Sequence, residues 1–305
     1  MLRQRTLRKP AHAIGIGVHS GNKVRMTLRP AEANTGIRFV RADCPDVAVA
    51  ALAQNVSSTL LSTSISEEGS NVSTVEHLMS ALWGLAIDNA VIELSGDEVP
   101  IMDGSAGPFV KLIESVGSRA QSAPRKFIRI TRELTVSQDD AVATLSPYNG
   151  FKGAYTFVAD HPVYNRYPKR VELDFTRDSF GDDLSQARSF GLIDDLPRAQ
   201  AIDRCLGSSL ENAVGIADDC VLNKEGLRYV DEFAKHKLLD AIGDLYLLGL
   251  PMFAAFDGYM SGHSLNNELA RAVLLQPDSW ELVSADNLRV SDDHGLPSLR
   301  KVGVS

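Results

Sequence analysis

Two apolar runs, each with a histidine at its start and a glycine seven residues later, divide the chain into comparable halves. The first is HLMSALWG from His77 to Gly84, and the second is HKLLDAIG from His236 to Gly243. Each run is followed by a turn signal and a strand-like stretch, AVIEL in one half and MFAAF in the other. Apolar residues at helical spacing followed by a β-like run predict a helix and then a strand. The chain is therefore expected to be α+β and to repeat one plan twice.

Alternation of apolar and polar residues predicts further strands. The segment GSRAQSAPR near the middle of the chain is small, polar and contains a proline, which is typical of a linker. We therefore expect a first α+β domain over residues 1–118, a linker over 119–126 and a second α+β domain over 127–305. The expected strands are Lys23–Arg29, Ala90–Leu94, Phe127–Ile130, Ala141–Leu145 and Val171–Phe175.

Charge, apolar runs and cysteines limit the classes of protein to which the chain can belong. The chain has 31 basic and 39 acidic residues, a net charge of −8, which disfavours a broad nucleic-acid surface. No apolar run has the roughly 20 residues of a membrane span, and the N-terminus lacks the pattern of a secretory signal. Cys44, Cys205 and Cys220 are far apart and in no CxxC spacing, which predicts neither a disulfide framework nor a cysteine zinc site. These features predict a protein of the reducing cytoplasm.

Three side chains of metal-ligand type recur every four residues in DEFAKHKLLDAIGDLYLLG, namely His236, Asp240 and Asp244. At about 100° per residue they span about 80° and form one stripe on a helix. One interpretation is a solvated acidic stripe with a His–Asp pair one turn apart. The other is a metal site, because an imidazole and a carboxylate one turn apart can hold one Zn²⁺ ion. The apolar residues around the stripe would make a buried stripe depend on such a cation.

The segment STVEH also has two interpretations. Ser73 and Glu76 have the spacing of a capping box, with Ser73 as the N-cap of a helix. Alternatively, His77 completes a set of three metal ligands with His236 and Asp240, if the two halves face each other. A hydrolytic zinc site has three protein ligands and one open position for water. Glu76 would then be well placed to take a proton from that water.

Two further histidines are candidate functional residues because of the glycines next to them. His263 in SGHSLNN comes directly after a glycine, which predicts a tight loop that exposes the imidazole before a helix over Glu268–Leu275. Because histidine titrates near neutrality, a loop histidine in a cleft can act as a general acid. His19 lies in the glycine-rich loop GIGVHSG and is a candidate for a position near a site, although the loop makes no phosphate-binding fingerprint.

Five motifs occur in the order STVEHL, PIMDGSAGPFV, ARSFG, VLNKEGLRYVDEFAKHKLLDAIGDL and SGHSLNN. Together they closely resemble the UDP-3-O-acyl-N-acetylglucosamine deacetylase family of lipid A biosynthesis, and the similarity extends from GIGVHSG to at least SGHSLNN. The resemblance implies two similar domains, each a β-sheet layer with helices, packed helix to helix as a β-α-α-β sandwich. It also implies an active site between the domains, one catalytic Zn²⁺ ion with Fe²⁺ as an alternative, and an acyl-passage insert in the second domain.

Carried over position by position, the resemblance implies roles for nine side chains. Many members of the family have Thr at the position of Ser189, where Ser keeps the hydroxyl. Some members have Lys at the position of Met260, so the resemblance does not indicate how this chain meets the charge of the nucleotide. The implied roles are metal ligand for His77, His236 and Asp240; general base for Glu76 and proton donor for His263; support of catalysis for Lys237 and Asp244; and substrate binding for Ser189, Phe190 and again Lys237.

The implied reaction is removal of the 2-N-acetyl group of UDP-3-O-(3-hydroxyacyl)-N-acetylglucosamine, which gives acetate and the 2-amino sugar nucleotide, the committed step of lipid A biosynthesis. The partner is then this acylated UDP-sugar, with no nucleic acid and no transmembrane segment, and the protein is expected to be a cytoplasmic monomer. The acyl chain needs an apolar passage, for which Leu60–Ile65, Phe190–Ile193 and Leu196 are candidates. Two alternatives stay open: a zinc amidohydrolase of another acylated sugar, and a non-catalytic protein that binds a metal or a nucleotide.

Overall fold

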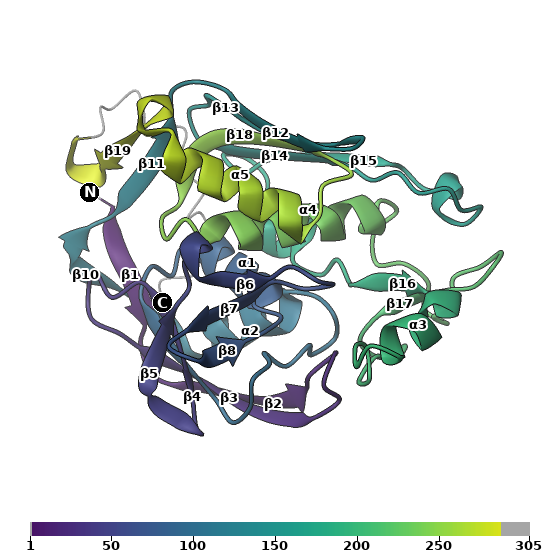
Figure 1. The fold of residues 1–305 in the computed structure, drawn as a ribbon. Coiled ribbons are helices and arrows are strands. Elements are labelled where there is room, and N and C mark those ends of the chain that lie inside the picture. Colours follow the sequence, from purple (N-terminus) through teal and green to yellow (C-terminus); the bar gives the residue numbers. More distant parts are fainter. Residues whose placement is uncertain (1, 288–305) are drawn as a thin grey trace.

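The computed structural model of the chain describes residues 2–287 (Figure 1). The expected second domain extends to residue 305, so its part from residue 288 onward lies outside the described residues. The α-helices are α1 (Glu76–Gly84), α2 (Gly107–Val116), α3 (Leu196–Gln200), α4 (Glu232–Tyr246) and α5 (His263–Leu275). The strands are β1 (Arg3–Leu7), β2 (Ala11–Ile16), β3 (Lys23–Pro30), β4 (Ile37–Arg41), β5 (Cys44–Ala50), β6 (Val56–Ser58), β7 (Ser64–Glu67), β8 (Ser70–Val72), β9 (Ala90–Leu94), β10 (Ser118–Pro124), β11 (Lys126–Ile130), β12 (Leu134–Gln138), β13 (Ala141–Ser146), β14 (Phe151–Thr156), β15 (Arg170–Asp174), β16 (Phe190–Leu192), β17 (Val214–Ile216), β18 (Met252–Tyr259) and β19 (Trp280–Ser284).

Two large sheets dominate the architecture. The five-stranded sheet has the order β2-β3-β9-β4-β5, in which only β4 and β9 run parallel. In the seven-stranded sheet β18 is central and pairs with β13, β14 and β11. Figure 1 shows helices α1, α2, α4 and α5 between the two sheets. Sheets and helices are segregated in this way in α+β proteins, so the predicted α+β class is confirmed.

The predicted strands are all present within a residue or two of their expected bounds, as β3, β9, β11, β13 and β15. Side chains of β3 alternate between buried and exposed positions, as the period-two pattern requires. The segment expected to be a linker contains a strand. Residues 118–124 form strand β10, which pairs antiparallel with β1 and has no fully buried residue, as its small polar composition suggests. None of the helices within residues 2–287 combines the length and apolar character that a membrane span requires.

Helices α1 and α4 pack closely because of a glycine. A Cβ atom built on Gly243 of α4 would lie 2.0 Å from the carbonyl oxygen of Glu76, the first residue of α1. The equivalent glycine of the first run, Gly84, faces the ring of Phe180 instead, with 2.2 Å to a built Cβ. The repeated glycine of the two runs therefore marks a close approach in both halves, but to different partners.

Replacement of Gly243 by alanine is expected to lower the free energy of unfolding by about 3 kcal/mol or more, at or above the upper end of the usual cost of overpacking. The new methyl group would displace a backbone carbonyl, which cannot rotate away as a side chain can. The matched control is Gly181→Ala, where the nearest atom to a built Cβ is 3.7 Å away. Urea unfolding of both variants tests this, and equal stabilities would contradict the close packing of α1 on α4.

Candidate metal centre and active site

A strained turn positions the start of α1. Thr74 has a φ angle of 58°, which is unusual for a β-branched residue. Its hydroxyl donates a hydrogen bond to Glu98 (3.1 Å), which also accepts from the backbone N–H groups of His19 and Ser20 (2.8 and 2.9 Å). Glu98 thus links the glycine-rich loop to the turn before α1. Sequence analysis missed Glu98, since its partners lie far away along the chain.

The capping-box interpretation of STVEH is wrong. The first residue of α1 is Glu76 and its N-cap position is Val75, where no side chain caps the helix. The Ser73 hydroxyl donates to the backbone carbonyl of Asp97, and Glu76 accepts a hydrogen bond from the backbone N–H of Thr63 (3.1 Å). Glu76 is 3% exposed, so its carboxyl group points into the protein rather than back along the helix.

The stripe on α4 is buried. His236, Asp240 and Asp244 are 4%, 3% and 1% exposed, so the interpretation as a solvated acidic stripe is wrong. The Nδ1 atom of His236 lies 3.0 Å from the carbonyl oxygen of Ala187. A carbonyl can only accept, so Nδ1 carries the proton and Nε2 keeps its lone pair. Burial lowers the pKa of His236 to about 3, and the imidazole is therefore neutral at neutral pH.

Two imidazoles and one carboxylate converge across the α1–α4 contact. Asp240 Oδ1 lies 3.3 Å from His77 Nε2 and 3.4 Å from His236 Nε2, and the three ligand-type atoms lie within 4.8 Å of one another. Asp240 Oδ1 is buried and has no hydrogen-bond partner. A buried carboxylate oxygen without a donor is costly, and a cation at this point would satisfy it. These residues therefore fit a metal ion, and no fourth His, Cys, Asp or Glu of residues 2–287 joins the group.

Lys237 binds the outer oxygen of the same carboxylate. Its Nζ atom lies 2.7 Å from Asp240 Oδ2. Burial favours the neutral amine, but the charge and hydrogen bond of Asp240 raise the pKa of Lys237 above its usual value. Burial likewise opposes ionisation of Asp240, yet His236 and Lys237 hold its pKa well below the usual range. Asp240 is thus an ionised carboxylate with one oxygen bound by Lys237 and one free for a cation.

A pair of acid–base groups lies beside this centre. His263 Nδ1 is 2.9 Å from Asp244 Oδ2, and His263 Nε2 is 3.9 Å from Glu76 Oε1. His263 is the first residue of helix α5, so the expected exposed loop is wrong: its side chain is only 10% exposed. Helix α5 follows strand β18 directly, which brings its N-terminus to the C-terminal half of α4.

The pKa values of this pair are shifted in the same direction. Burial raises the pKa of the Glu76 carboxyl, although His263 and His77 oppose the shift. Burial by itself would lower the pKa of His263, but the charge and hydrogen bond of Asp244, together with Glu76, raise it to about 9. A base with a raised pKa beside an imidazolium that persists at neutral pH is the arrangement that general acid–base catalysis requires.

Sequence analysis missed two residues that hold this pair. Thr63 donates its hydroxyl hydrogen to Asp244 Oδ1 (2.6 Å), and Asn266 donates from Nδ2 to Asp244 Oδ2 (2.9 Å). Asn266 lies three residues after His263 within SGHSLNN, so helical spacing could have indicated it. Thr63 is 181 residues from Asp244 along the chain, and no local pattern relates them.

Ser189 and Phe190, the two residues of ARSFG that were expected to bind substrate, lie in different surroundings. Phe190 packs at the edge of the metal-ligand group, with its ring centroid 5.9 Å from that of His236 and 4.9 Å from that of Phe233. Ser189 is half-buried, and its backbone pairs with Gly104 and Val214. Met260 is 39% exposed. Phe190 therefore adjoins the centre directly, whereas Ser189 connects the strand that carries Phe190 to the rest of the fold.

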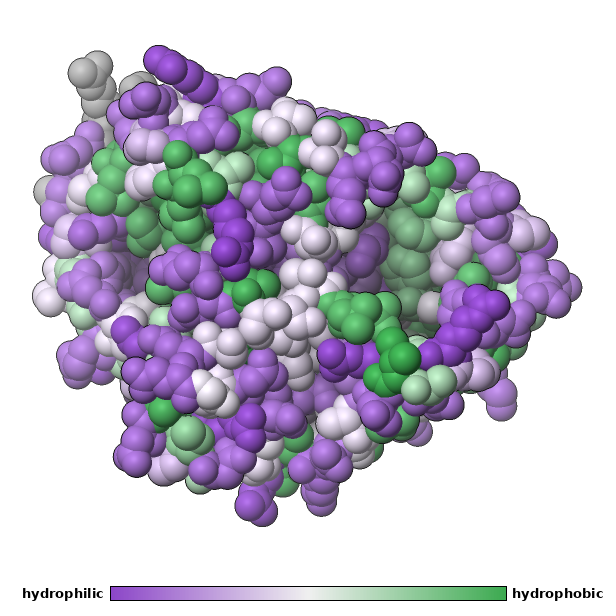
Figure 2. Space-filling model, in the orientation of Figure 1, coloured by the Kyte–Doolittle hydropathy of each residue, from purple (hydrophilic) through white to green (hydrophobic). Residues whose placement is uncertain are grey.

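Several apolar side chains are exposed to solvent near the expected acyl passage. Figure 2 shows a hollow with apolar walls on the side where β16 and β17 lie in Figure 1. Leu60 and Leu61 before β7 are 51% and 53% exposed, and Ile193 after β16 is 40% exposed. The other residues predicted to line an acyl passage in the first segment, 62–65, are buried, so only its two leucines present apolar surface there.

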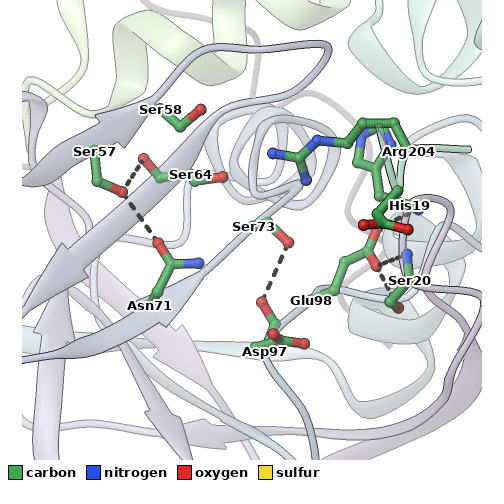
Figure 3. Close-up of a pocket in the computed structure, with 11 residues that line it drawn as sticks. His19, Ser20, Ser57, Ser58, Ser64, Asn71, Ser73, Asp97, Glu98 and Arg204 are labelled. Carbon is green, nitrogen blue, oxygen red and sulfur yellow. Dashed lines mark hydrogen bonds between the residues drawn. The ribbon is translucent and has the colours of Figure 1, made fainter. Parts of the chain in front are cut away.

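A polar cavity of about 480 Å³ opens beside β7 and β8 (Figure 3). His19 is 4% exposed and lines it, and its Nε2 atom has no hydrogen-bond partner. Serine and carboxylate side chains make up most of the remaining wall, which excludes this cavity as the passage for an alkyl chain. The lining residues are His19, Ser20, Ser57, Ser58, Ser64, Asn71, Ser73, Asp97, Glu98, Asp203 and Arg204.

Comparison with known proteins supports one chemistry. Residues 4–275 match the model of a family described as UDP-3-O-acyl N-acetylglycosamine deacetylase. A protein of Chromohalobacter salexigens named UDP-3-O-acyl-N-acetylglucosamine deacetylase is 52% identical over 94% of this chain and 95% of its own. A protein of the same name from Hahella chejuensis is 50% identical over 94% of this chain and 95% of its own. Another, from Pseudomonas entomophila, is 51% identical over 93% of this chain and 94% of its own.

Proposed function

Because the chain belongs to the UDP-3-O-acyl N-acetylglycosamine deacetylase family, we propose that its active site is the buried group at the α1–α4 contact and that the metal there is Zn²⁺. The chain is an amide hydrolase, a deacetylase of lipid A biosynthesis. The proposed substrate is UDP-3-O-(3-hydroxyacyl)-N-acetylglucosamine, and the products are acetate and the 2-amino sugar nucleotide.

One observation is central to this proposal. Asp240 Oδ1 is buried without a hydrogen bond between the Nε2 atoms of His77 and His236. Two imidazoles and one carboxylate are a ligand set of catalytic zinc sites, which keep a further position open for water. A Zn²⁺ ion bound there would polarise the acetamide carbonyl and lower the pKa of a water molecule. The same set admits Fe²⁺, because imidazole and carboxylate suit both metals.

The remaining side chains supply the proton transfers. Glu76, whose Oε1 atom faces His263, takes the proton from the attacking water. His263, kept protonated by Asp244, gives a proton to the leaving sugar amine. Lys237 and the hydroxyl of Ser189 are proposed to stabilise the negative charge that develops on the carbonyl oxygen. Phe190 is proposed to contact the sugar.

The arrangement of layers suggests how the substrate enters. We propose that the five-stranded sheet with α1 and α2, and the seven-stranded sheet with α4 and α5, are two similar domains packed helix to helix, with the site at their contact. The segment β16–α3–β17 projects beside that contact in Figure 1 and would be the acyl-passage insert. Leu60, Leu61 and Ile193 would line the passage, since they expose apolar surface beside it.

The unpaired cysteines support a proposal for the cellular compartment of the protein. All three cysteines are free, and burial raises the thiol pKa of Cys205, so it is not a reactive thiolate. Unpaired cysteines are typical of a reducing compartment, and on this basis we propose the cytoplasm. The expected monomeric state stays a prediction, which analytical ultracentrifugation would test.

Turnover should depend on parts of the substrate far from the reacting amide. N-acetylglucosamine without UDP and without the acyl chain is expected to be hydrolysed with a kcat/KM at least about 10³-fold lower, because remote binding energy is used at the reacting centre. Measurement of acetate release from the full substrate, from the sugar nucleotide without the acyl chain and from the free sugar checks this. Efficient hydrolysis of the free sugar would favour a general sugar deacetylase, and no hydrolysis of any of them would favour a binding protein.

A further inference from the structure

Thr63 contacts both acid–base groups of the proposed site through different atoms. Its backbone N–H donates to Glu76 Oε2 (3.1 Å), and its carbonyl oxygen accepts from the N–H of Val75 (3.2 Å). Its hydroxyl donates to Asp244 Oδ1 (2.6 Å), on the helix that faces α1. The residue is 1% exposed, so no water competes for these bonds. The main chain of Thr63 is thus fixed against α1, and the hydroxyl alone reaches α4.

The hydroxyl completes the set of donors around the Asp244 carboxylate. Oδ2 accepts from His263 Nδ1 (2.9 Å) and from Asn266 Nδ2 (2.9 Å), whereas Oδ1 accepts from Thr63. A carboxylate with donors on one oxygen only can rotate about its Cβ–Cγ bond, and a donor on the other oxygen fixes its plane. The plane of Asp244 decides the direction in which the ring of His263 points, because His263 is bound to it through Nδ1.

We propose that Thr63 is a positioning residue that holds the proton donor and the general base in one geometry, with its hydroxyl aiming His263 through Asp244 and its N–H fixing the Glu76 carboxylate. The inference rests on the roles proposed above for Glu76 and His263. Outer-shell partners of this kind act on the rate of the chemical step, because they hold a group in place rather than bind substrate.

The experiment removes the Thr63 hydroxyl and keeps the shape and the backbone hydrogen bonds of the residue. Thr63→Val has nearly the same shape and the same backbone donor to Glu76, whereas Thr63→Ser keeps the hydroxyl and loses a methyl group. We expect kcat of the Val variant to fall about 10- to 100-fold with KM nearly unchanged, and the Ser variant to recover most of the loss. Ser62→Ala is the matched control, since the Ser62 hydroxyl is buried in the same loop and has no hydrogen-bond partner.

A second readout does not depend on turnover. The proton on Nδ1 of His263 should give a downfield NMR resonance in the metal-free protein, identified by its absence in His263→Gln. This resonance should shift or broaden in Thr63→Val and return in Thr63→Ser. A purely structural role would lower thermal stability of both variants without this pattern. If the Val variant does not fold, Thr63→Ala against Thr63→Ser makes the same comparison.

The outcomes separate this inference from the proposed function. If Thr63→Val keeps the wild-type kcat and resonance while His263→Gln is impaired, Thr63 has no positioning role and the proposed acid stands. Equal losses in the Val and Ser variants would also overturn the inference, because the hydroxyl would then not be the cause. If His263→Gln itself keeps the wild-type kcat, both the assignment of the acid and the role of Thr63 are wrong.

Discussion

Substitution of His236 by alanine is expected to remove the bound metal ion and to lower turnover by more than about 100-fold, and His77→Ala and Asp240→Ala should do the same. The three ligand-type atoms lie within 4.8 Å of one another, and loss of any one leaves two ligands for the ion. Loss of a direct ligand should exceed the about 10- to 100-fold effect of an outer-shell partner. Elemental analysis of the purified variants, together with turnover measured after addition of Zn²⁺ or Fe²⁺, checks this.

The matched control is His12→Ala, which removes an exposed imidazole on β2 whose Nδ1 lies near the hydroxyl of Thr27. This variant should keep metal content and turnover. Full retention of metal by all three ligand variants would place the ion elsewhere. Restoration of turnover by Fe²⁺ as well as Zn²⁺ in the wild-type protein would leave the ligand set intact and show that metal supply decides which ion is used.

Glu76→Gln and His263→Gln are each expected to lower kcat by about 10²- to 10⁴-fold while the metal stays bound, the usual contribution of a general base or acid. Both glutamines keep the approximate shape and can keep one hydrogen bond, so stability should change little. Glu93→Gln is the control for the carboxylate, because the Glu93 side chain is 41% exposed and forms a surface ion pair with Arg29. Near-normal kcat in either site variant would contradict the role proposed for that residue.

The pH dependence of kcat/KM gives the sign of each role. Glu76 must be ionised to accept a proton, and burial raises its pKa, so activity should be lost as the pH falls through that raised value. His263 must be protonated, and its pKa is about 9, so activity should be lost as the pH rises through about 9. A bound cation would lower both values by repelling positive charge. The alkaline limb should disappear in His263→Gln, although limbs of coupled groups belong to the site as a whole.

Local spacing explains what could be predicted. His236, Asp240 and Asp244 belong to one helix, where a period of 3.6 residues places them on one side before any tertiary contact is known. Strands such as β3 and β9 show alternation that their half-buried positions require. His77 was associated with the other ligands only through a repeat in the sequence and a resemblance, and the structure brings it to them through the close contact of α1 with α4.

The capping-box prediction failed because a distant partner competed with a local signal. Ser73 and Glu76 have capping-box spacing, but the Glu76 carboxyl is bound by Thr63 and faces the opposite helix. Residues 118–124 have the composition of a linker, and their backbone also pairs with that of β1. In both places a partner from another part of the chain offered a hydrogen bond that the local pattern could not indicate.

By itself the sequence determined helices α1 and α4, strands such as β3 and β9, and the chemical types of the site, because these depend on the order of neighbouring residues. Tertiary structure alone decided that Asp240 Oδ1 lacks a hydrogen bond, that Thr63 reaches Asp244 and that His263 faces Glu76. Each of these features depends on how elements far apart in the chain pack together, and each depends on burial. Burial decides whether a carboxylate is solvated or needs a cation, and it is a property of the packed molecule rather than of any segment.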